Sequence, residues 1–120
     1  MALSSGFLDY VLEQFETLGG VSSRRMFGGA GLYRDGLFFG LVSSDVLYLK
    51  ADDENRPQFE AVGAAQFNPF PDKPGMGSMS YYAAPVEVLE QPDELAEWAR
   101  RALGAAARKP TPKRGPRARR

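Results

Sequence analysis

The sequence predicts an α+β domain in which one antiparallel sheet carries helices on one face. Two observations predict it. Apolar residues recur at helical spacing near both ends of the chain, and short apolar runs separated by turn signals lie between them. The predicted element order, α-β-β-β-α-β-β-α, fits a two-layer arrangement. A chain of 120 residues, 43% of them hydrophobic, can build one such domain with a modest core but not two.

The first element is a helix over residues 6–18. Phe7, Val11 and Phe15 recur there at helical spacing, while acidic residues fall largely on the other side. The glycine pair at 19–20 can end the helix, because glycine adopts the left-handed conformation without a steric penalty.

A three-stranded meander follows the first helix. Its strands are expected over residues 25–33, 37–42 and 46–50, which are rich in aromatic and branched residues. The turns between them are expected at residues 34–36 and 43–45, where aspartate, glycine and serine gather.

The second half of the chain is expected to add a helix, two strands and a last helix. The helix covers residues 54–62 and is broken by the glycine that follows. A short strand is expected near Phe67 and another over residues 77–83, with prolines between them that favour an edge position. The last helix begins near Pro92, carries an apolar stripe as far as Leu103, and could run on through the alanines at 105–107.

Composition excludes several kinds of chemistry. The chain has no cysteine and no histidine, so disulfides, thiolate nucleophiles, Cys/His zinc sites and histidine general bases are absent. The remaining polar residues form no recognisable catalytic set, and we expect a protein that is not an enzyme and holds no cofactor or metal. No apolar run approaches the roughly 20 residues of a membrane span, and no signal peptide is visible at the start, so we expect a cytoplasmic protein.

The net charge of zero conceals a split between two segments. Residues 1–103 hold 8 basic and 15 acidic residues, a balance of −7, whereas residues 104–120 hold 7 basic and no acidic residues. We therefore expect a folded domain over residues 1–104 and a disordered basic tail over residues 105–120. The tail cations are candidates for non-specific contact with nucleic acid: Arg108, Lys109, Lys113, Arg114, Arg117, Arg119 and Arg120. The tail could equally be a solubilising extension, or fold back on the acidic domain.

A pair of arginines next to a glycine cluster is the candidate site within the domain. The guanidinium groups of Arg24 and Arg25, with the backbone amides of Gly28 and Gly29, could bind an anion or a partner. The glycines do not complete a dinucleotide-binding fingerprint or a P-loop. They could instead allow a bulge or close packing, and one arginine could simply pair with a carboxylate of the domain.

The aromatic and acidic residues have structural explanations that compete with functional ones. Aromatic rings on a sheet can stack on nucleic-acid bases, but most are needed for the core of a small domain. If the outer face exposes Tyr33, Tyr48 or Tyr82, a dimer or partner interface is the more natural role. The acidic run at 52–54 lacks the spacing of a calcium loop, and acids are favoured at the start of a helix by its dipole.

The run from Arg24 to Tyr33, continuing to Leu41, resembles the signature of the TfoX (Sxy) N-terminal domain family. Residues 81–85 and 95–99 supply further matches, and the resemblance extends from about residue 7 to residue 103. It implies a two-layer fold similar to that of secretion chaperones. It also implies a role near transcription, since the competence regulators of the family are thought to work alongside the cyclic-AMP receptor protein at promoters. Those regulators carry a helical C-terminal domain, and we expect the basic tail to stand in its place here.

The expected function is therefore that of a non-enzymatic regulatory module. It would act through contact with a protein of the transcription machinery or with a regulator, and the tail would add non-specific contact with DNA. The sequence also leaves open whether the protein forms a homodimer, and no membrane partner is expected. The alternative is a small protein that binds an anion through Arg24, Arg25 and the glycine-rich strand.

Overall fold

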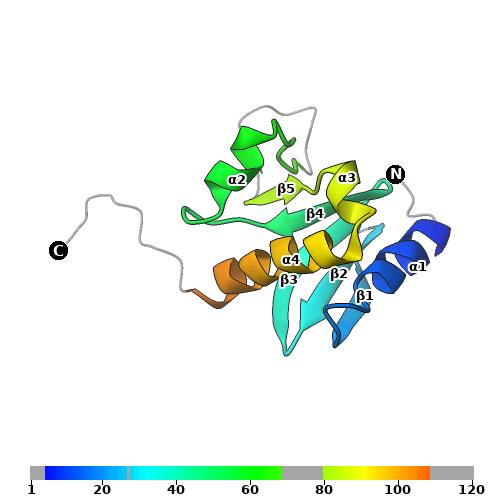
Figure 1. The fold of residues 1–120 in the computed structure, drawn as a ribbon. Helices are drawn as coiled ribbons and strands as arrows, with labels where there is room; N and C mark the ends of the chain where they lie inside the picture. The colour runs from blue at the N-terminus through cyan, green and yellow to red at the C-terminus, as the bar shows by residue number, and fades with distance from the viewer. Residues whose placement is uncertain (1–4, 27, 69–79, 109–120) are drawn as a thin grey trace.

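The computed structural model describes residues 5–26, 28–68 and 80–108 of the chain (Figure 1). Its elements, in chain order, are α1 (Ser5–Gln14), β1 (Val21–Met26), β2 (Gly29–Arg34), β3 (Leu37–Ser43), β4 (Val46–Lys50), α2 (Arg56–Ala61), β5 (Tyr81–Ala83), α3 (Val86–Leu89) and α4 (Pro92–Ala107). The order is α-β-β-β-β-α-β-α-α, which confirms the predicted α+β class. The number of strands is the predicted five, with one more strand before α2 and one fewer after it, and there is one additional helix.

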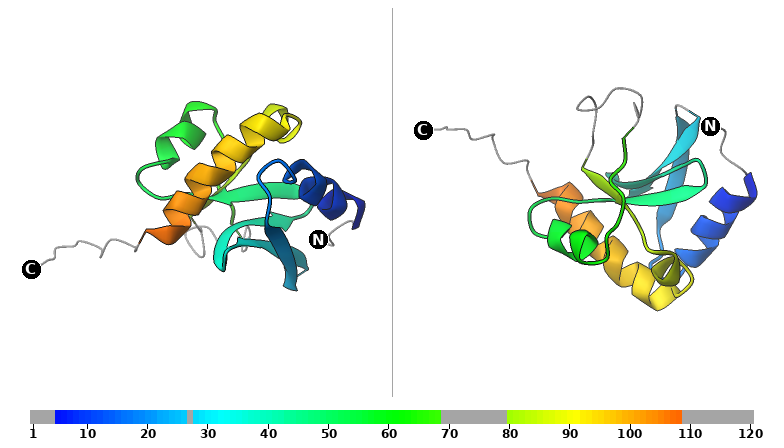
Figure 2. Two further views of the ribbon diagram at one scale, coloured as in Figure 1. Left: turned by 60° about the horizontal axis from the view of Figure 1, so that its bottom comes forward. Right: turned by 90° about the horizontal axis from the view of Figure 1, so that it is seen from above.

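The sheet has five strands in the order β1-β2-β3-β4-β5, and every neighbouring pair is antiparallel. The helices lie on one face of this sheet, with α4 running across β3 and β4 (Figure 2). β1 and β5 are the two edge strands among the described residues. The predicted two-layer arrangement is therefore confirmed.

The hairpin turns in the meander lie where the sequence predicts them. Asp35 and Gly36 have φ values of 54° and 79°, and Ser44 and Asp45 have φ values of 51° and 59°. Two successive residues with positive φ match the right-handed twist of the flanking strands. β3 and β4 follow these turns and confirm the strands predicted over residues 37–42 and 46–50.

The single strand predicted over residues 25–33 is wrong, because two strands occupy this region. Gly28 has a φ of 78° and lies between β1 and β2, where it allows the chain to reverse. β1 begins at Val21, in a run of serines and arginines without the alternation that marks a half-buried strand.

The first predicted helix is too long at its C-terminus. α1 ends at Gln14, and the following residues continue as turns that reach Gly19, whose N–H donates to the carbonyl oxygen of Phe15. The φ values of Gly19 and Gly20 are 81° and 75°, so the glycine pair ends this segment as predicted.

The second half follows the prediction less closely. The strand expected near Phe67 is reduced to an isolated bridge between Gln66 and Tyr82. The strand expected over residues 77–83 appears as β5, while residues 69–79 lie outside the described part of the chain. α3 was not predicted, since four residues are too few for a periodic pattern.

α4 runs on past Leu103 through the alanines at 105–107, an extension that the sequence left open. Ala105 is buried, and the helix runs to Ala107, past residue 104 where we expected the domain to end. The predicted tail from Lys109 onward lies outside the described residues, so its predicted disorder stays a prediction.

The core lies between the helices and the covered face of the sheet. Its largest fully buried side chains come from α1's flank, the central strands, α2 and α4. Phe15 packs edge-on against Phe39 with ring centroids 5.6 Å apart, and Phe59 contacts Trp98 in the same manner at 5.2 Å. In the described part of the chain, no helix is long and apolar enough to cross a bilayer.

Candidate interaction surfaces

Arg24 and Arg25 both lie on β1 and are exposed, but they project from opposite faces of the sheet. Arg24 lies opposite Gly31 and Arg25 lies opposite Ala30, whose side chain belongs to the core. Successive side chains of a strand alternate between faces. The structure therefore does not bring the two guanidinium groups together around one position, and neither forms an ion pair with a carboxylate of the described residues.

Gly28 and Gly29 lie at the β1–β2 hairpin, where Gly28 has a positive φ and the position of Gly29 has a packing explanation. Gly29 is buried, and a Cβ there would lie deep inside van der Waals contact with the carbonyl oxygen of Val42. Gly31 leaves room for side chains instead, since a Cβ there would lie 2.9 Å from Met26 Cε and 3.0 Å from Phe38 Cε1. These glycines allow backbone and side chains to approach the strand closely.

The face of the sheet opposite the helices carries a row of aromatic rings with a cation at each end. Tyr33 stacks on Phe38 with centroids 5.1 Å apart, and Phe38 contacts Tyr81 at 5.6 Å. The guanidinium carbon of Arg24 lies 5.9 Å from the ring centre of Tyr33, and Lys50 Nζ lies 5.1 Å from that of Tyr81. We call these five residues the aromatic row.

The rings of the aromatic row stabilise one another. Burial, with a smaller contribution from neighbouring Tyr33, raises the pKa of Tyr81 to about 12. Arg24 comes from β1 and Phe38 from β3, on either side of β2, so both sides of the Tyr33 ring are occupied. A base therefore has no free ring surface on Tyr33, which argues against the stacking that sheet-based RNA-binding domains use.

The tyrosines named as candidates for an outer interface are divided between the two faces. Tyr33 and Tyr48 are half-buried on the face away from the helices, where Tyr48 also contacts Phe67 with centroids 4.8 Å apart. Tyr82 lies on the covered face and stacks on Phe59 at 5.4 Å. Of the three, Tyr82 is thus the core residue.

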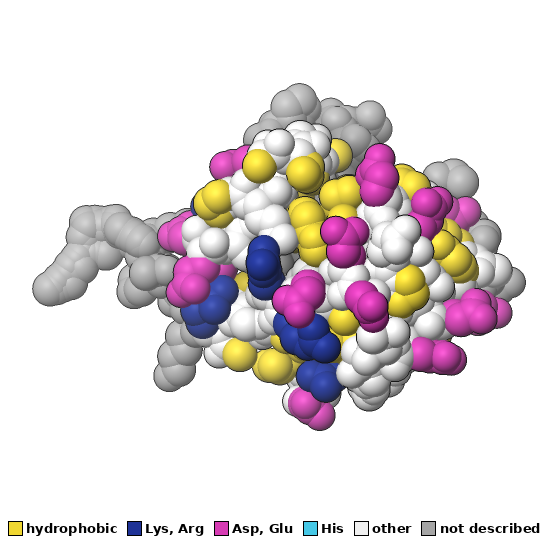
Figure 3. Space-filling view, in the orientation of Figure 1, with side chains coloured by type: hydrophobic (Ala, Val, Ile, Leu, Met, Phe, Trp, Pro, Cys, Tyr) yellow, Lys and Arg dark blue, Asp and Glu magenta, His cyan; other side chains and the backbone are white. Residues whose placement is uncertain are grey.

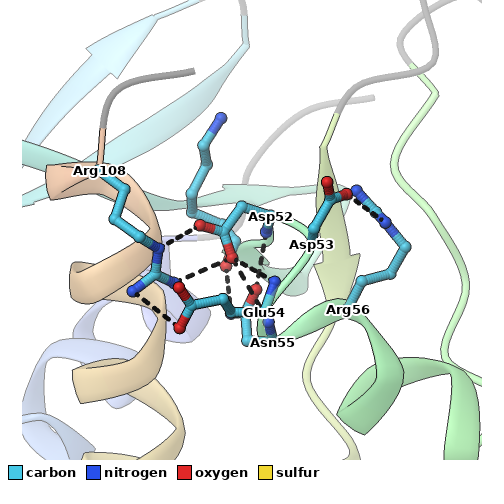
Figure 4. A network of polar contacts seen from close by, with 7 residues as sticks. Asp52, Asp53, Glu54, Asn55, Arg56 and Arg108 are labelled. Atoms are coloured by element: carbon cyan, nitrogen blue, oxygen red, sulfur yellow. Dashed lines mark hydrogen bonds and ion pairs between the residues drawn. The ribbon is translucent and has the colours of Figure 1, made fainter. Parts of the chain in front are cut away.

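The acidic run at residues 52–54 meets the start of the basic tail (Figure 4). Arg108 donates two hydrogen bonds to the carboxylate of Asp52, from Nε to Oδ2 and from Nη2 to Oδ1, the second 2.9 Å long. It also approaches Glu54 Oε1 at 3.5 Å. The Arg108 hydrogen bonds, helped by backbone N–H donors, lower the pKa of Asp52 to about 2 against the effect of partial burial.

Asn55 builds the other half of this network and was missed by sequence reasoning. It is 5% exposed, accepts a hydrogen bond from the Asp52 N–H at 2.7 Å, and donates one to the Lys50 carbonyl at 3.0 Å. We call Asp52, Asn55 and Arg108 the α4 latch, because they fasten the end of α4 to the turn before α2. The only sequence signal was that asparagine and aspartate often organise turns.

A shallow groove of about 450 Å³ lies between α2 and the C-terminal half of α4. Three arginines line it, but Arg100 pairs with Glu97 at 3.0 Å and Arg108 belongs to the latch. Figure 3 shows basic side chains gathered over and beside this part of α4, with acidic side chains spread around them. The groove therefore offers a small anion little unpaired positive charge.

The sequence model of the TfoX N-terminal domain matches residues 13–106, which include β1, the aromatic row and almost all of α4. The DNA transformation protein TfoX1 of Aliivibrio fischeri is 34% identical over 65 residues. That match covers 54% of this chain and 29% of the relative, so less than a third of the relative's length is represented. Both matches agree with the resemblance seen in the sequence.

Proposed function

Because the chain belongs to the TfoX N-terminal domain family, we propose that it is a non-enzymatic regulatory module that acts by binding another protein. The partner would be a component or regulator of the transcription machinery. The similarity to a protein named for DNA transformation supports a role in gene regulation related to competence. The basic tail would add non-specific contact with DNA.

The observation that carries this proposal is the face of the sheet away from the helices of the described residues. This face carries the aromatic row, in which Tyr33 and Phe38 are half-buried, Tyr81 is buried, and Arg24 and Lys50 lie at the ends. Aromatic residues and arginine are enriched where proteins bind one another. The closed stacking of the rings favours a flat protein contact over insertion of bases.

The DNA contact is supported by the distribution of charge. Arg108 is paired with Asp52, so the six cations from Lys109 onward are the ones available to phosphates in this proposal. The folded part is acidic, with 15 carboxylates against 8 cations over residues 1–103, and would by itself repel a polyanion.

Two measurements test the proposed function. The first is a transcript survey of the native host with the gene deleted and restored. Reproducible changes that the restored gene reverses support regulation, and an unchanged survey contradicts it. The second is binding to a random DNA duplex between 50 and 200 mM salt, for the full chain and for a truncation after Arg108. Binding by the full chain alone, weakening roughly 10³-fold or more if all six cations contact phosphates, supports the tail contact.

A further inference from the structure

β1 is an edge strand, and its outer side pairs with no other strand of the described residues. β1 pairs with β2 on one side, is the end strand of the sheet, and has exposed residues throughout its middle from Ser22 to Arg25 (Figures 1 and 2). Every second residue of such a strand turns its N–H and C=O groups away from the sheet, where another strand can pair with them.

The two arginines give this edge a positive charge on each face of the sheet. Arg24 sits above the face with the aromatic row, and Arg25 sits on the side of the helices. No carboxylate of the described residues pairs with either one. A strand added along β1 would therefore meet one cation on each of its faces, at adjacent positions.

A second copy of β1 fits this edge poorly. β1 reads Val-Ser-Ser-Arg-Arg-Met and contains no acidic residue. In antiparallel pairing of two copies over their full length, Arg24 and Arg25 would lie opposite Ser23 and Ser22 of the other copy, so no ion pair would form, and two arginines would lie diagonally on each face. The edge therefore fits a strand of opposite charge better than a copy of itself.

We propose that the edge of β1 binds an extended segment of the partner protein that carries two adjacent acidic residues, which pairs with β1 as a sixth strand. Adjacent residues of that segment point to opposite faces, so one carboxylate meets Arg24 and the other meets Arg25. The backbone hydrogen bonds supply affinity and the two ion pairs supply specificity. The inference rests on the proposed function and names the site and chemistry of its protein contact.

A peptide strand fits this edge better than a nucleic acid does. A strand uses the unpaired backbone groups of β1, which phosphates cannot match along its length. The adjoining Tyr33 ring is already occupied on both sides and offers no stacking surface. A longer polyanion would also run alongside the acidic domain, whereas a short segment brings only two charges to the arginines.

The experiment uses the full chain labelled with ¹⁵N and an acetylated probe peptide, Thr-Val-Thr-Glu-Glu-Val-Thr-Val. Addition of the peptide is expected to shift the amide signals of residues 21–26 and to slow their hydrogen exchange. A peptide with Gln-Gln in place of Glu-Glu is expected to bind about tenfold more weakly, since two ion pairs of this kind together correspond to roughly that factor. Of two peptides with proline directly before or directly after the glutamates, the one in which proline replaces an N–H that faces β1 is expected to bind more weakly, because it loses a ladder donor.

Charge reversal in the protein separates this site from the tail, which also attracts acidic peptides. The Arg24→Glu/Arg25→Glu variant is expected to bind the Glu-Glu peptide at least about tenfold more weakly and to prefer a Lys-Lys peptide. The matched control, Arg100→Glu/Arg101→Glu, reverses two adjacent exposed arginines on α4 and is expected to change the affinity less than about twofold.

Four results would overturn the inference. These are equal binding of the Gln-Gln peptide, peptide-induced shifts that spare β1, an equal loss of affinity in the α4 control, and shifts at β1 produced by an oligonucleotide or by self-association instead. If the peptide fails while the transcript survey shows regulation, the site is wrong and the proposed function stands. If the survey shows no regulation but the peptide binds at β1, the function falls and the site stands.

Discussion

The two faces of the sheet are built from the same strands but held together differently. On the covered face, side chains such as Leu32, Phe39 and Leu49 are fully buried beneath the helices. On the opposite face, Tyr33 and Phe38 are half-buried and are held mainly by neighbouring rings and cations across the strands. The fully buried side chains among these are therefore on the covered face, while contacts between rings and cations hold the rings on the other face.

The adjacent residues Phe38 and Phe39 give the sharpest test of this difference. Phe39→Ala is expected to lower the free energy of unfolding by about 3–5 kcal/mol, because it empties a fully buried site between the sheet and α1. Phe38→Ala is expected to cost only about 1–2 kcal/mol, since the ring is partly exposed. Urea denaturation measures both, with Phe39→Leu as a milder variant if Phe39→Ala does not fold. Equal losses would show that the two faces are equivalent cores.

Gly29 and Gly31 contrast backbone packing with side-chain packing. Gly29→Ala is expected to cost about 3 kcal/mol, because the new Cβ meets the Val42 carbonyl oxygen, which the β3 backbone holds in place. Gly31→Ala is expected to cost about 1 kcal/mol, since the ends of Met26 and Phe38 side chains can shift on the open face. Thermal unfolding compares the variants. A larger loss at Gly31 would mean that the aromatic row is as rigid as the core.

The α4 latch extends the covered face to the end of the last helix. Asp52→Asn is expected to cost about 1 kcal/mol near neutral pH, after allowance for solvent screening of a pair whose side chains are 27% and 38% exposed. The folded-state pKa of Asp52 lies below its usual 3.8, at about 2. Its contribution is thus present above pH 4 and disappears as the pH falls towards 2.

Urea titrations between pH 7 and pH 2 check this dependence, since wild type and Asp52→Asn should converge in stability at the acidic end. Asp53→Asn is the matched control. Its carboxylate pairs with Arg56 at 2.8 Å but the Asp53 side chain is 81% exposed, so its removal should change little. A constant difference between wild type and Asp52→Asn at all pH values would contradict the role of the ionised pair.

The elements set by local chemistry could be predicted from the sequence. The turns at Asp35 and Gly36, and the glycine pair after α1, follow from residues that tolerate positive φ. β1 could not be delimited, because an exposed edge strand carries no apolar alternation. The two faces of a strand can be assigned from alternation only once the limits of the strand are known. The sequence therefore did not predict that Arg24 and Arg25 project from opposite faces of the sheet.

The contacts set by tertiary structure were beyond sequence reasoning. Arg108 and Asp52 are 56 residues apart and meet only because α4 crosses the sheet and ends above the turn before α2. The aromatic row also depends on a register shift between Leu32 and Tyr33, which sets Tyr33 opposite Phe38. Sequence reasoning identified Arg24, Tyr33 and Asp52 as notable, but their partners came from packing.

The smallest expected effects concern the arginines of β1. Arg24→Ala is expected to cost about 0.5 kcal/mol through the lost contact with Tyr33, and Arg25→Ala close to nothing, since it has no ion-pair partner among the described residues. Urea denaturation of the two variants and their double mutant measures this. Losses above about 2 kcal/mol would assign the pair a structural role. Small losses would mean that these exposed cations contribute little to folding, and a binding role would then account for two arginines on an edge strand of an acidic domain.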